Sequence, residues 1–167
     1  MILRPTTVYD PREKYNVLEL CRAIKKGIFR YIGSGENFWS FTYVDNVVSA
    51  AILAAKSKLT EGNTYFVSDE RPYRVKEIVE AFSRAMGVPP PRGHLPVRLA
   101  MAISLPFELY SLLTRSRPLL SQSRVRTLSM NYVYDISRLR ALGYRQVVSL
   151  EEGARRTVQW YQENKLL

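Results

Sequence analysis

The chain has 167 residues, enough for one domain with a buried core, and its 46% hydrophobic and 24% charged residues are ordinary for a globular protein. Twenty-five lysines and arginines against 15 acidic residues give a net charge of +10, which would suit a nucleic acid, an anionic lipid or an anionic cofactor. The single cysteine, Cys21, excludes an internal disulfide and fits a reducing compartment, so we expect a cytoplasmic protein.

Short strands alternate with helices along the first half of the chain. The pattern predicts strands over residues 2–9, 28–32, 38–44 and 64–67. Apolar residues at helical spacing predict one helix that contains Val17 and ends at Gly27, and another that begins at Val44. This alternation predicts an α/β fold.

The second half of the chain is expected to be mostly helical. Helices are predicted over residues 75–86, 97–113, 137–142 and from Leu150 onward. Ser149 and Glu152 have the spacing of a capping box, in which the serine oxygen and the glutamate carboxylate each satisfy a free backbone amide. Residues 114–131 are expected to be irregular and basic.

The longest apolar segment runs from Leu95 to Leu113. Arg98, Glu108 and two prolines interrupt it, whereas a membrane-spanning helix needs about 20 mostly apolar residues. The segment therefore predicts an amphipathic helix packed over a pocket, with contact to a membrane surface as the alternative.

Several patterns that are typical of catalytic sites are interpreted as structural. Residues 33–38 (Gly-Ser-Gly-Glu-Asn-Phe) begin like a dinucleotide fingerprint, but a phenylalanine replaces the third glycine and an extended run follows, which favours a tight turn. Tyr161 and Lys165 match a Tyr-x-x-x-Lys spacing, yet they lie in the last turn and are not expected to be catalytic. His94 and Cys21 are expected to be structural, and no metal site is predicted.

Four aromatic residues lie within six positions of the chain, namely Phe38, Trp39, Phe41 and Tyr43. With the basic residues nearby, they suggest a base-stacking platform for nucleic acid. The basic residues are scattered, however, and no block of five or six occurs. We therefore expect a pocket wall or a core strand here, and no nucleic-acid partner.

Five segments resemble, in order and spacing, the extended short-chain dehydrogenases/reductases of the NAD-dependent epimerase/dehydratase superfamily. They are residues 4–11 (Arg-Pro-Thr-Thr-Val-Tyr-Asp-Pro), 40–48 (Ser-Phe-Thr-Tyr-Val-Asp-Asn-Val-Val), 62–69 (Gly-Asn-Thr-Tyr-Phe-Val-Ser-Asp), 134–144, and 149–153 with Trp160. Within the superfamily, Val-Asp-Asn and Tyr-Phe-Val-Ser-Asp are most similar to the 3-beta-hydroxysteroid dehydrogenase branch. Trp39 stands where nucleotide-sugar epimerases commonly have an arginine that binds a diphosphate, which favours an apolar substrate.

The resemblance implies that residues 1–167 are a single domain, the C-terminal substrate-binding part of an extended Rossmann-fold dehydrogenase. The nucleotide-binding glycines and the catalytic Tyr-x-x-x-Lys would belong to an N-terminal Rossmann half that is absent here. The whole enzyme would use NAD or NADP to oxidise or reduce a hydroxyl or keto group of a steroid-like substrate. This chain alone is expected to be inactive and to bind no cofactor tightly.

The resemblance also implies site residues. Pro5, Thr6, Thr7 and Val8 would bind the cofactor by lying against the nicotinamide and offering backbone amides to its carboxamide. The substrate pocket would be shaped by Tyr9, Trp39 and Tyr43. Within the loop 114–131, the arginines Arg115, Arg117, Arg124 and Arg126 would close the pocket or bind an anionic group of the substrate.

Two alternatives stay open. The chain could belong to a nucleotide-sugar epimerase or dehydratase. It could also be an interaction module whose apolar surface, including strand 2–9 as an unprotected edge, pairs with the missing half or with another copy.

Overall fold

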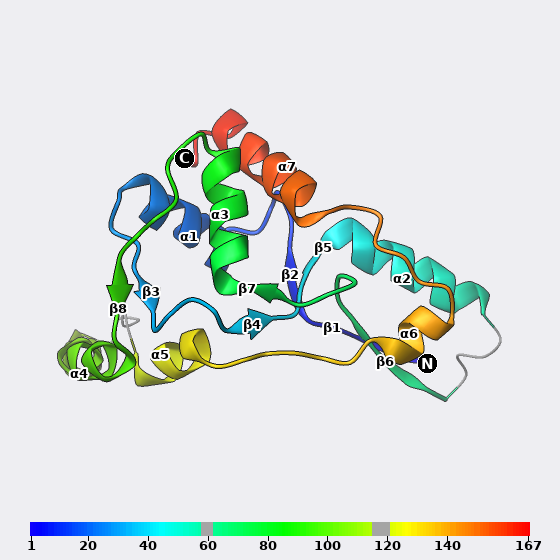
Figure 1. The fold of residues 1–167 in the computed structure, drawn as a ribbon, viewed down its shortest axis with the longest axis horizontal. Coiled ribbons are helices and arrows are strands. Elements are labelled where there is room, and N and C mark those ends of the chain that lie inside the picture. Colours follow the sequence, from blue (N-terminus) through cyan, green and yellow to red (C-terminus); the bar gives the residue numbers. More distant parts are fainter. Residues whose placement is uncertain (58–61, 115–120) are drawn as a thin grey trace.

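The computed structural model describes residues 1–57, 62–114 and 121–167, which form a mixed α/β structure of short strands and longer helices (Figure 1). The strands are β1 (Ile2–Pro5), β2 (Thr7–Tyr9), β3 (Tyr31–Ile32), β4 (Phe38–Trp39), β5 (Phe41–Tyr43), β6 (Thr64–Val67), β7 (Tyr73–Arg74) and β8 (His94–Leu95). The helices are α1 (Asn16–Lys25), α2 (Val44–Lys56), α3 (Val75–Ala85), α4 (Val97–Thr114), α5 (Gln122–Ser129), α6 (Ser137–Ala141) and α7 (Leu150–Glu163).

The strands pair two by two over the described ranges. β1 pairs with β6, β2 with β5 and β3 with β8, all parallel, whereas β4 and β7 are antiparallel. Parallel pairs require long connections, and here the helices provide them. The chain therefore changes partner between β1 and β2, since Pro5 lies opposite Val67 and Thr7 lies opposite Phe41.

Three apolar clusters hold the described elements together; one of them joins Ile24, Tyr31 and Val79, and the other two bear on the site. In the larger one, helices α1, α3 and α7 lie side by side and pack on β2 and β5 (Figure 1); its fully buried members include Tyr9, Cys21, Phe82 and Tyr161. In the smaller one, α2 and α6 pack with β6 around Tyr65 and Leu139. The helices are amphipathic because their apolar residues recur at helical spacing, which is the pattern that the sequence shows.

The prediction of one buried strand over residues 2–9 is wrong in two respects. The segment is divided at Thr6 into β1 and β2, which pair with different strands. β1 is largely exposed, with Ile2 at 55% of its free surface, whereas Tyr9 at the end of β2 is fully buried. The apolar composition indicated burial, but this strand has a partner along one edge and little cover on its faces.

Two further expectations require correction. The strand predicted over residues 28–32 is limited to Tyr31–Ile32, because the preceding residues leave α1 through a turn at Gly27. The segment 114–131 was predicted to be irregular, but it contains α5, whose first turn is capped by the Ser121 hydroxyl accepting the amide of Arg124 at 3.2 Å. Residues 115–120 lie outside the described residues.

The apolar segment forms α4, in agreement with the prediction, and Pro106 lies inside this helix. Over the ranges given above, the structure contains no helix with both the length and the apolar character needed to span a bilayer.

Gly153 in α7 provides a test of how tightly the larger cluster is packed. A β-carbon there would collide with the hydroxyl of Tyr9 and lie 2.9 Å from Cδ2 of Tyr43. Gly153→Ala is expected to lower the free energy of unfolding by about 1–3 kcal/mol, because overpacking exceeds the gain in helix propensity. Urea denaturation measures this change.

Gln162→Ala, on the exposed face of the same helix, is the matched control and should stay within about 0.5 kcal/mol of the parent chain. Equal stability of the Gly153→Ala variant and the parent would show that α7 can move away from Tyr9 at no cost.

Candidate functional site

The bend between β1 and β2 is formed by Pro5, Thr6, Thr7 and Val8, the residues predicted to contact a cofactor. The amide of Thr6 donates to the carbonyl oxygen of Val67 at 3.0 Å, which fixes the bend to the end of β6. The Thr6 hydroxyl is buried and has no hydrogen-bond partner among the described residues. A buried hydroxyl without a partner is costly, and Tyr31, Thr42, Tyr144 and Thr157 share this state among the described residues.

Tyr9 and Tyr43, which were predicted to shape a substrate pocket, lie in the larger apolar cluster. Tyr9 is fully buried, its ring stacks on Phe41 with centroids 4.4 Å apart, and its hydroxyl donates to the carbonyl oxygen of Leu150 at 3.4 Å. Tyr43 is 4% exposed. Burial raises the pKa of both phenols, so they are protonated at neutral pH and support the wall of the site from behind.

Trp39 is half-buried and lies beside the end of α5. Its indole Nε1 donates to the carbonyl oxygen of Met130 at 3.2 Å, and its ring meets the ring of Tyr132 edge-on. Asn37 donates from Nδ2 to the same carbonyl at 2.9 Å. The structure therefore brings Trp39 and the segment that follows α5 together, although they are about 90 residues apart in the sequence.

The predicted arginines are divided between described and undescribed parts of the chain. Arg124 and Arg126 are exposed on α5, while Arg115 and Arg117 lie outside the described residues. The site residues thus form two groups: the bend with its buried tyrosine support, and the exposed surface of Trp39 and α5.

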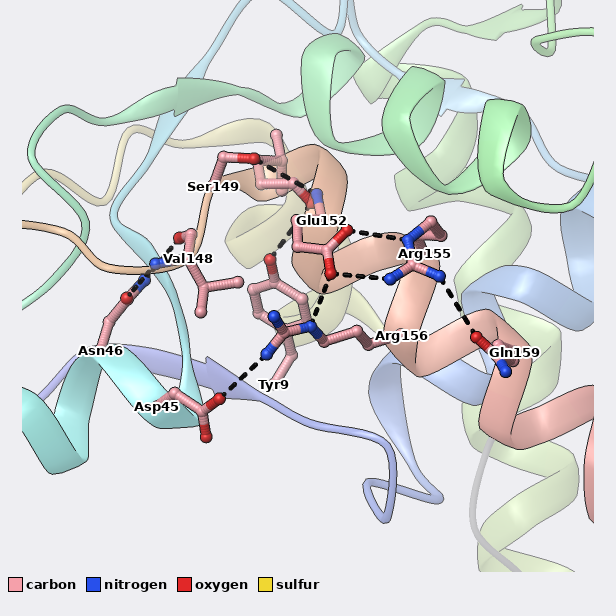
Figure 2. Close-up of polar contacts among 10 residues, drawn as sticks. Tyr9, Asp45, Asn46, Val148, Ser149, Glu152, Arg155, Arg156 and Gln159 are labelled. Carbon is pink, nitrogen blue, oxygen red and sulfur yellow. Dashed lines mark hydrogen bonds and ion pairs between the residues drawn. The ribbon is translucent and has the colours of Figure 1, made fainter.

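Asn46 at the start of α2 connects the elements that carry this site. Its Oδ1 accepts the amides of Val147 and Val148 at 3.0 and 2.8 Å, and its Nδ2 donates to the carbonyl oxygen of Val148 at 2.9 Å and to Asp69 at 2.7 Å. Figure 2 shows the contact between Asn46 and Val148. The side chain is fully buried and uses both its oxygen and its nitrogen twice. The Val-Asp-Asn motif therefore acts here as a structural clamp between α2, the end of β6 and the segment before α7.

Asp69 is the buried charge of this clamp. It is 1% exposed, and its Oδ2 accepts from the hydroxyl of Tyr73 at 3.0 Å and from Nε2 of Gln146 at 3.1 Å. Burial raises the pKa of Asp69 to about 6, although the hydrogen bonds from Asn46 and Tyr73 oppose that rise. The carboxyl group therefore titrates just below neutral pH.

A second, exposed link joins α2 to α7. Arg156 donates to Asp45 at 3.2 Å and to Glu152 at 2.7 Å, and Arg155 also donates to Glu152 (Figure 2). Hydrogen bonds from these two arginines lower the pKa of Glu152 to about 2. The capping box is therefore only half formed: the Ser149 hydroxyl accepts the amide of Glu152 as predicted, but the carboxylate of Glu152 binds arginines.

The structure describes the residues of the patterns that the sequence analysis interpreted as structural. The hydroxyl of Tyr161 is buried and donates to the carbonyl oxygen of Glu13, so it does not face solvent beside Lys165. A β-carbon on Gly35 would lie 2.9 Å from the ring of Tyr31, which covers the turn where a phosphate cradle would need open backbone. Nδ1 of His94 donates to the carbonyl oxygen of Gly33 at 3.1 Å.

Two open hollows flank the loop after β6. The larger hollow has a volume of about 730 Å³ and is lined by Ser40, residues 69–72 and 133–137, Arg140 and Ala141. The smaller hollow has a volume of about 440 Å³ and is lined by Glu70, Arg71, Tyr73 and residues 146–147 and 149–151. Neither hollow is lined by α4 or by the predicted site residues. Neither therefore supports the expectation that the apolar helix 97–113 packs over a pocket.

Gln146 is the clamp residue that sequence reasoning missed. It donates to Asp69 and to the carbonyl oxygen of Val148, yet it lies in a segment without a recognisable motif. Asn46 and Asp69 stand inside motifs that the sequence analysis singled out, so those motifs were the available signal. Nothing local in the sequence indicates the contact of Gln146, because its partner lies 77 residues away.

Comparison with known proteins gives consistent matches. A model of the 3-beta hydroxysteroid dehydrogenase/isomerase family matches residues 1–97. The 3beta-hydroxysteroid-dehydrogenase/decarboxylase isoform 1 of Arabidopsis thaliana is 35% identical over 170 residues, covering 93% of this chain and 39% of that protein. An N-acetyl-alpha-D-glucosaminyl-diphospho-ditrans,octacis-undecaprenol 4-epimerase of Escherichia coli O157:H7 is 26% identical, covering 95% of this chain and 48% of that protein.

Among solved structures, the human epimerase family protein SDR39U1 (isoform 2) with NADPH is similar with a TM-score of 0.69 at 16% identity, covering 94% of this chain and 47% of that one. This likeness in fold confirms the predicted α/β class. The chain spans less than half the length of each of these three proteins.

Asp69→Asn tests the buried carboxyl group of the clamp. Since the pKa of Asp69 is raised in the folded state, this group favours folding at low pH, and that contribution is lost as the pH rises through about 6. Between pH 5 and pH 7 the parent chain should lose about 1 kcal/mol more stability than the Asp69→Asn variant. Denaturant unfolding at the two pH values measures the difference.

Glu163→Gln, which removes an exposed carboxylate at the end of α7, is the control and should keep the pH dependence of the parent chain. Identical pH dependence of the Asp69→Asn variant and the parent would mean that another group titrates in this range.

Proposed function

Because this chain belongs to the 3-beta hydroxysteroid dehydrogenase/isomerase family, we propose that it carries the substrate-binding portion of an NAD(P)-dependent oxidoreductase. The substrate would be an apolar, sterol-like molecule, and the reaction would take place at a hydroxyl or keto group. The family match and the relative from Arabidopsis thaliana, a 3beta-hydroxysteroid-dehydrogenase/decarboxylase, support the dehydrogenase class.

The observation that carries the apolar substrate is the position of Trp39. Its single donor, Nε1, is already bonded to the carbonyl oxygen of Met130, so the indole has no polar group left to offer a ligand. What it does offer is a half-buried aromatic surface on β4, close to the end of α5. Such a surface is suited to a fused apolar ring system and cannot bind a diphosphate as an arginine would.

The bend between β1 and β2 fits the nicotinamide end of the cofactor. The bend is held in place by the amide of Thr6, which donates to the carbonyl oxygen of Val67 at the end of β6. Pro5 to Val8 would orient the ring while Tyr9 and Tyr43 support β2 and β5 from the core side. When bound, the cofactor supplies hydride transfer; the acid and base would come from outside the 167 residues, since Tyr161 is buried against Glu13.

The second candidate function is that of a nucleotide-sugar epimerase or dehydratase. It is favoured by the likeness to the epimerase of Escherichia coli and by Arg124 and Arg126, which are exposed on α5 and available to an anionic group. In that case the two arginines would hold the diphosphate that Trp39 cannot bind.

Calorimetric titration with a 3β-hydroxysterol tests the proposed substrate class. The chain is expected to bind the sterol saturably, and Trp39→Ala should weaken binding about tenfold because the indole supplies the aromatic contact. Trp160→Ala removes the chain's other tryptophan and should leave the affinity unchanged. Binding of UDP-glucose that depends on Arg124, with none of the sterol, would instead establish the epimerase alternative.

Fluorescence titration with NADH and NADPH tests the division of labour between this chain and the rest of the enzyme. No saturable binding in the micromolar range is expected, because the turn at 33–35 is covered by Tyr31 and the bend alone offers few contacts. Saturable micromolar binding would show that these 167 residues contain a complete cofactor site and would contradict the proposal.

A further inference from the structure

Helix α5, which carries two of the arginines of the candidate site, is short and partly exposed. It has eight residues; Val125 is fully buried, whereas Arg124 and Arg126 on either side of it are exposed. An isolated helix shorter than about 12 residues is marginal in water, so α5 depends on contacts with other elements. Side chains make such contacts at both of its ends.

Each end of α5 is held by a side chain from a distant part of the chain. At the N-terminal end, Oε1 of Glu108 in α4 accepts the amide of Gln122 at 2.7 Å. At the C-terminal end, Nδ2 of Asn37, the residue before β4, donates to the carbonyl oxygens of Leu128 and Met130 at 3.2 and 2.9 Å. The first amides and the last carbonyls of a helix have no partner within it, so both side chains supply what the helix lacks. They hold α5 between α4 and β4.

The carbonyl oxygen of Met130 is shared by Asn37 and Trp39. The indole Nε1 of Trp39 donates to it at 3.2 Å, beside the 2.9 Å bond from Asn37. The side chain of Met130 cannot fix this carbonyl by packing, because the residue is 56% exposed. The amide group of Asn37 therefore holds the acceptor that orients the indole ring.

Backbone bonds continue this contact along β4. The amide of Tyr132 donates to the carbonyl oxygen of Phe38 at 2.7 Å, and the amide of Ser40 donates to the carbonyl oxygen of Tyr132 at 2.6 Å. The amide of Phe38 donates to Oδ1 of Asn131 at 2.7 Å. These bonds begin at Asn131, beyond the end of α5, so the side chain of Asn37 provides the connection back to the helix.

We propose that Asn37 is a positioning residue of the candidate substrate site. Its amide holds the end of α5 against Trp39, so that the indole and the arginines of the helix present one fixed surface to a ligand. Asn37 touches no ligand and acts through the carbonyls of Leu128 and Met130. The effect on ligand binding rests on the proposed function, whereas the effect on Trp39 does not.

This position requires a side-chain amide. Both partners are carbonyl oxygens, so the side chain must donate two hydrogen bonds, and the amide nitrogen of asparagine carries two hydrogens. An ionised aspartate has nearly the same shape but only accepts hydrogen bonds, so it would oppose the two carbonyl oxygens. Asn37→Asp therefore removes the donors and keeps the size, whereas Asn37→Ala removes the whole group.

Fluorescence of a chain with a single tryptophan tests the positioning role. In a Trp160→Phe background, Trp39 is the remaining tryptophan. Asn37→Asp and Asn37→Ala are expected to shift its emission to longer wavelength, because the indole loses its fixed acceptor and meets more water. Calorimetric titration with a 3β-hydroxysterol should show about fivefold weaker binding by both variants, since the ligand must then order the end of α5.

The matched control is Asn164→Ala in the same background. Nδ2 of Asn164 donates to the carbonyl oxygen of residue 160 at 2.9 Å, which is the same kind of contact at the end of a different helix, α7. This variant should keep the emission and the affinity of its parent, and thermal unfolding verifies that all variants are folded.

Unchanged emission in Asn37→Asp, or an equal loss of affinity in Asn164→Ala, would overturn the positioning role. If the parent binds no sterol, the proposed function fails and the emission alone decides: a shift in both Asn37 variants supports the positioning role, and no shift overturns it.

Discussion

The buried amide of Asn46 is the contact on which the arrangement of the other elements depends. With two bonds accepted and two donated, it joins the start of α2 to the backbone at Val147 and Val148 and to the carboxyl group of Asp69. These three segments are separated by long stretches of sequence and belong to different helices and strands. An unsatisfied buried amide would be costly, so the segments are held in one relative position.

This clamp connects the two apolar clusters and thereby places the candidate site. The larger cluster supports β2 and β5 from behind through Tyr9 and Tyr43, and the smaller one supports β6, to which the bend at Thr6 is bonded. The bend is thus held between the two apolar clusters, whereas Trp39 and α5 lie on the surface beside it. In the proposed function, the bend would be the fixed contact for a cofactor and Trp39 the accessible aromatic surface for a substrate.

The sequence by itself determined the α/β class, the helices other than α5, and the family, because helical spacing, glycine stops and the five ordered motifs are local patterns. It did not determine that residues 2–9 divide at Thr6 or that β1 is largely exposed, since these depend on which distant strand lies alongside. The contact of Gln146 with Asp69 was likewise decided by the tertiary structure. In each case the contacting residue is distant in the sequence, so composition and spacing do not indicate the contact.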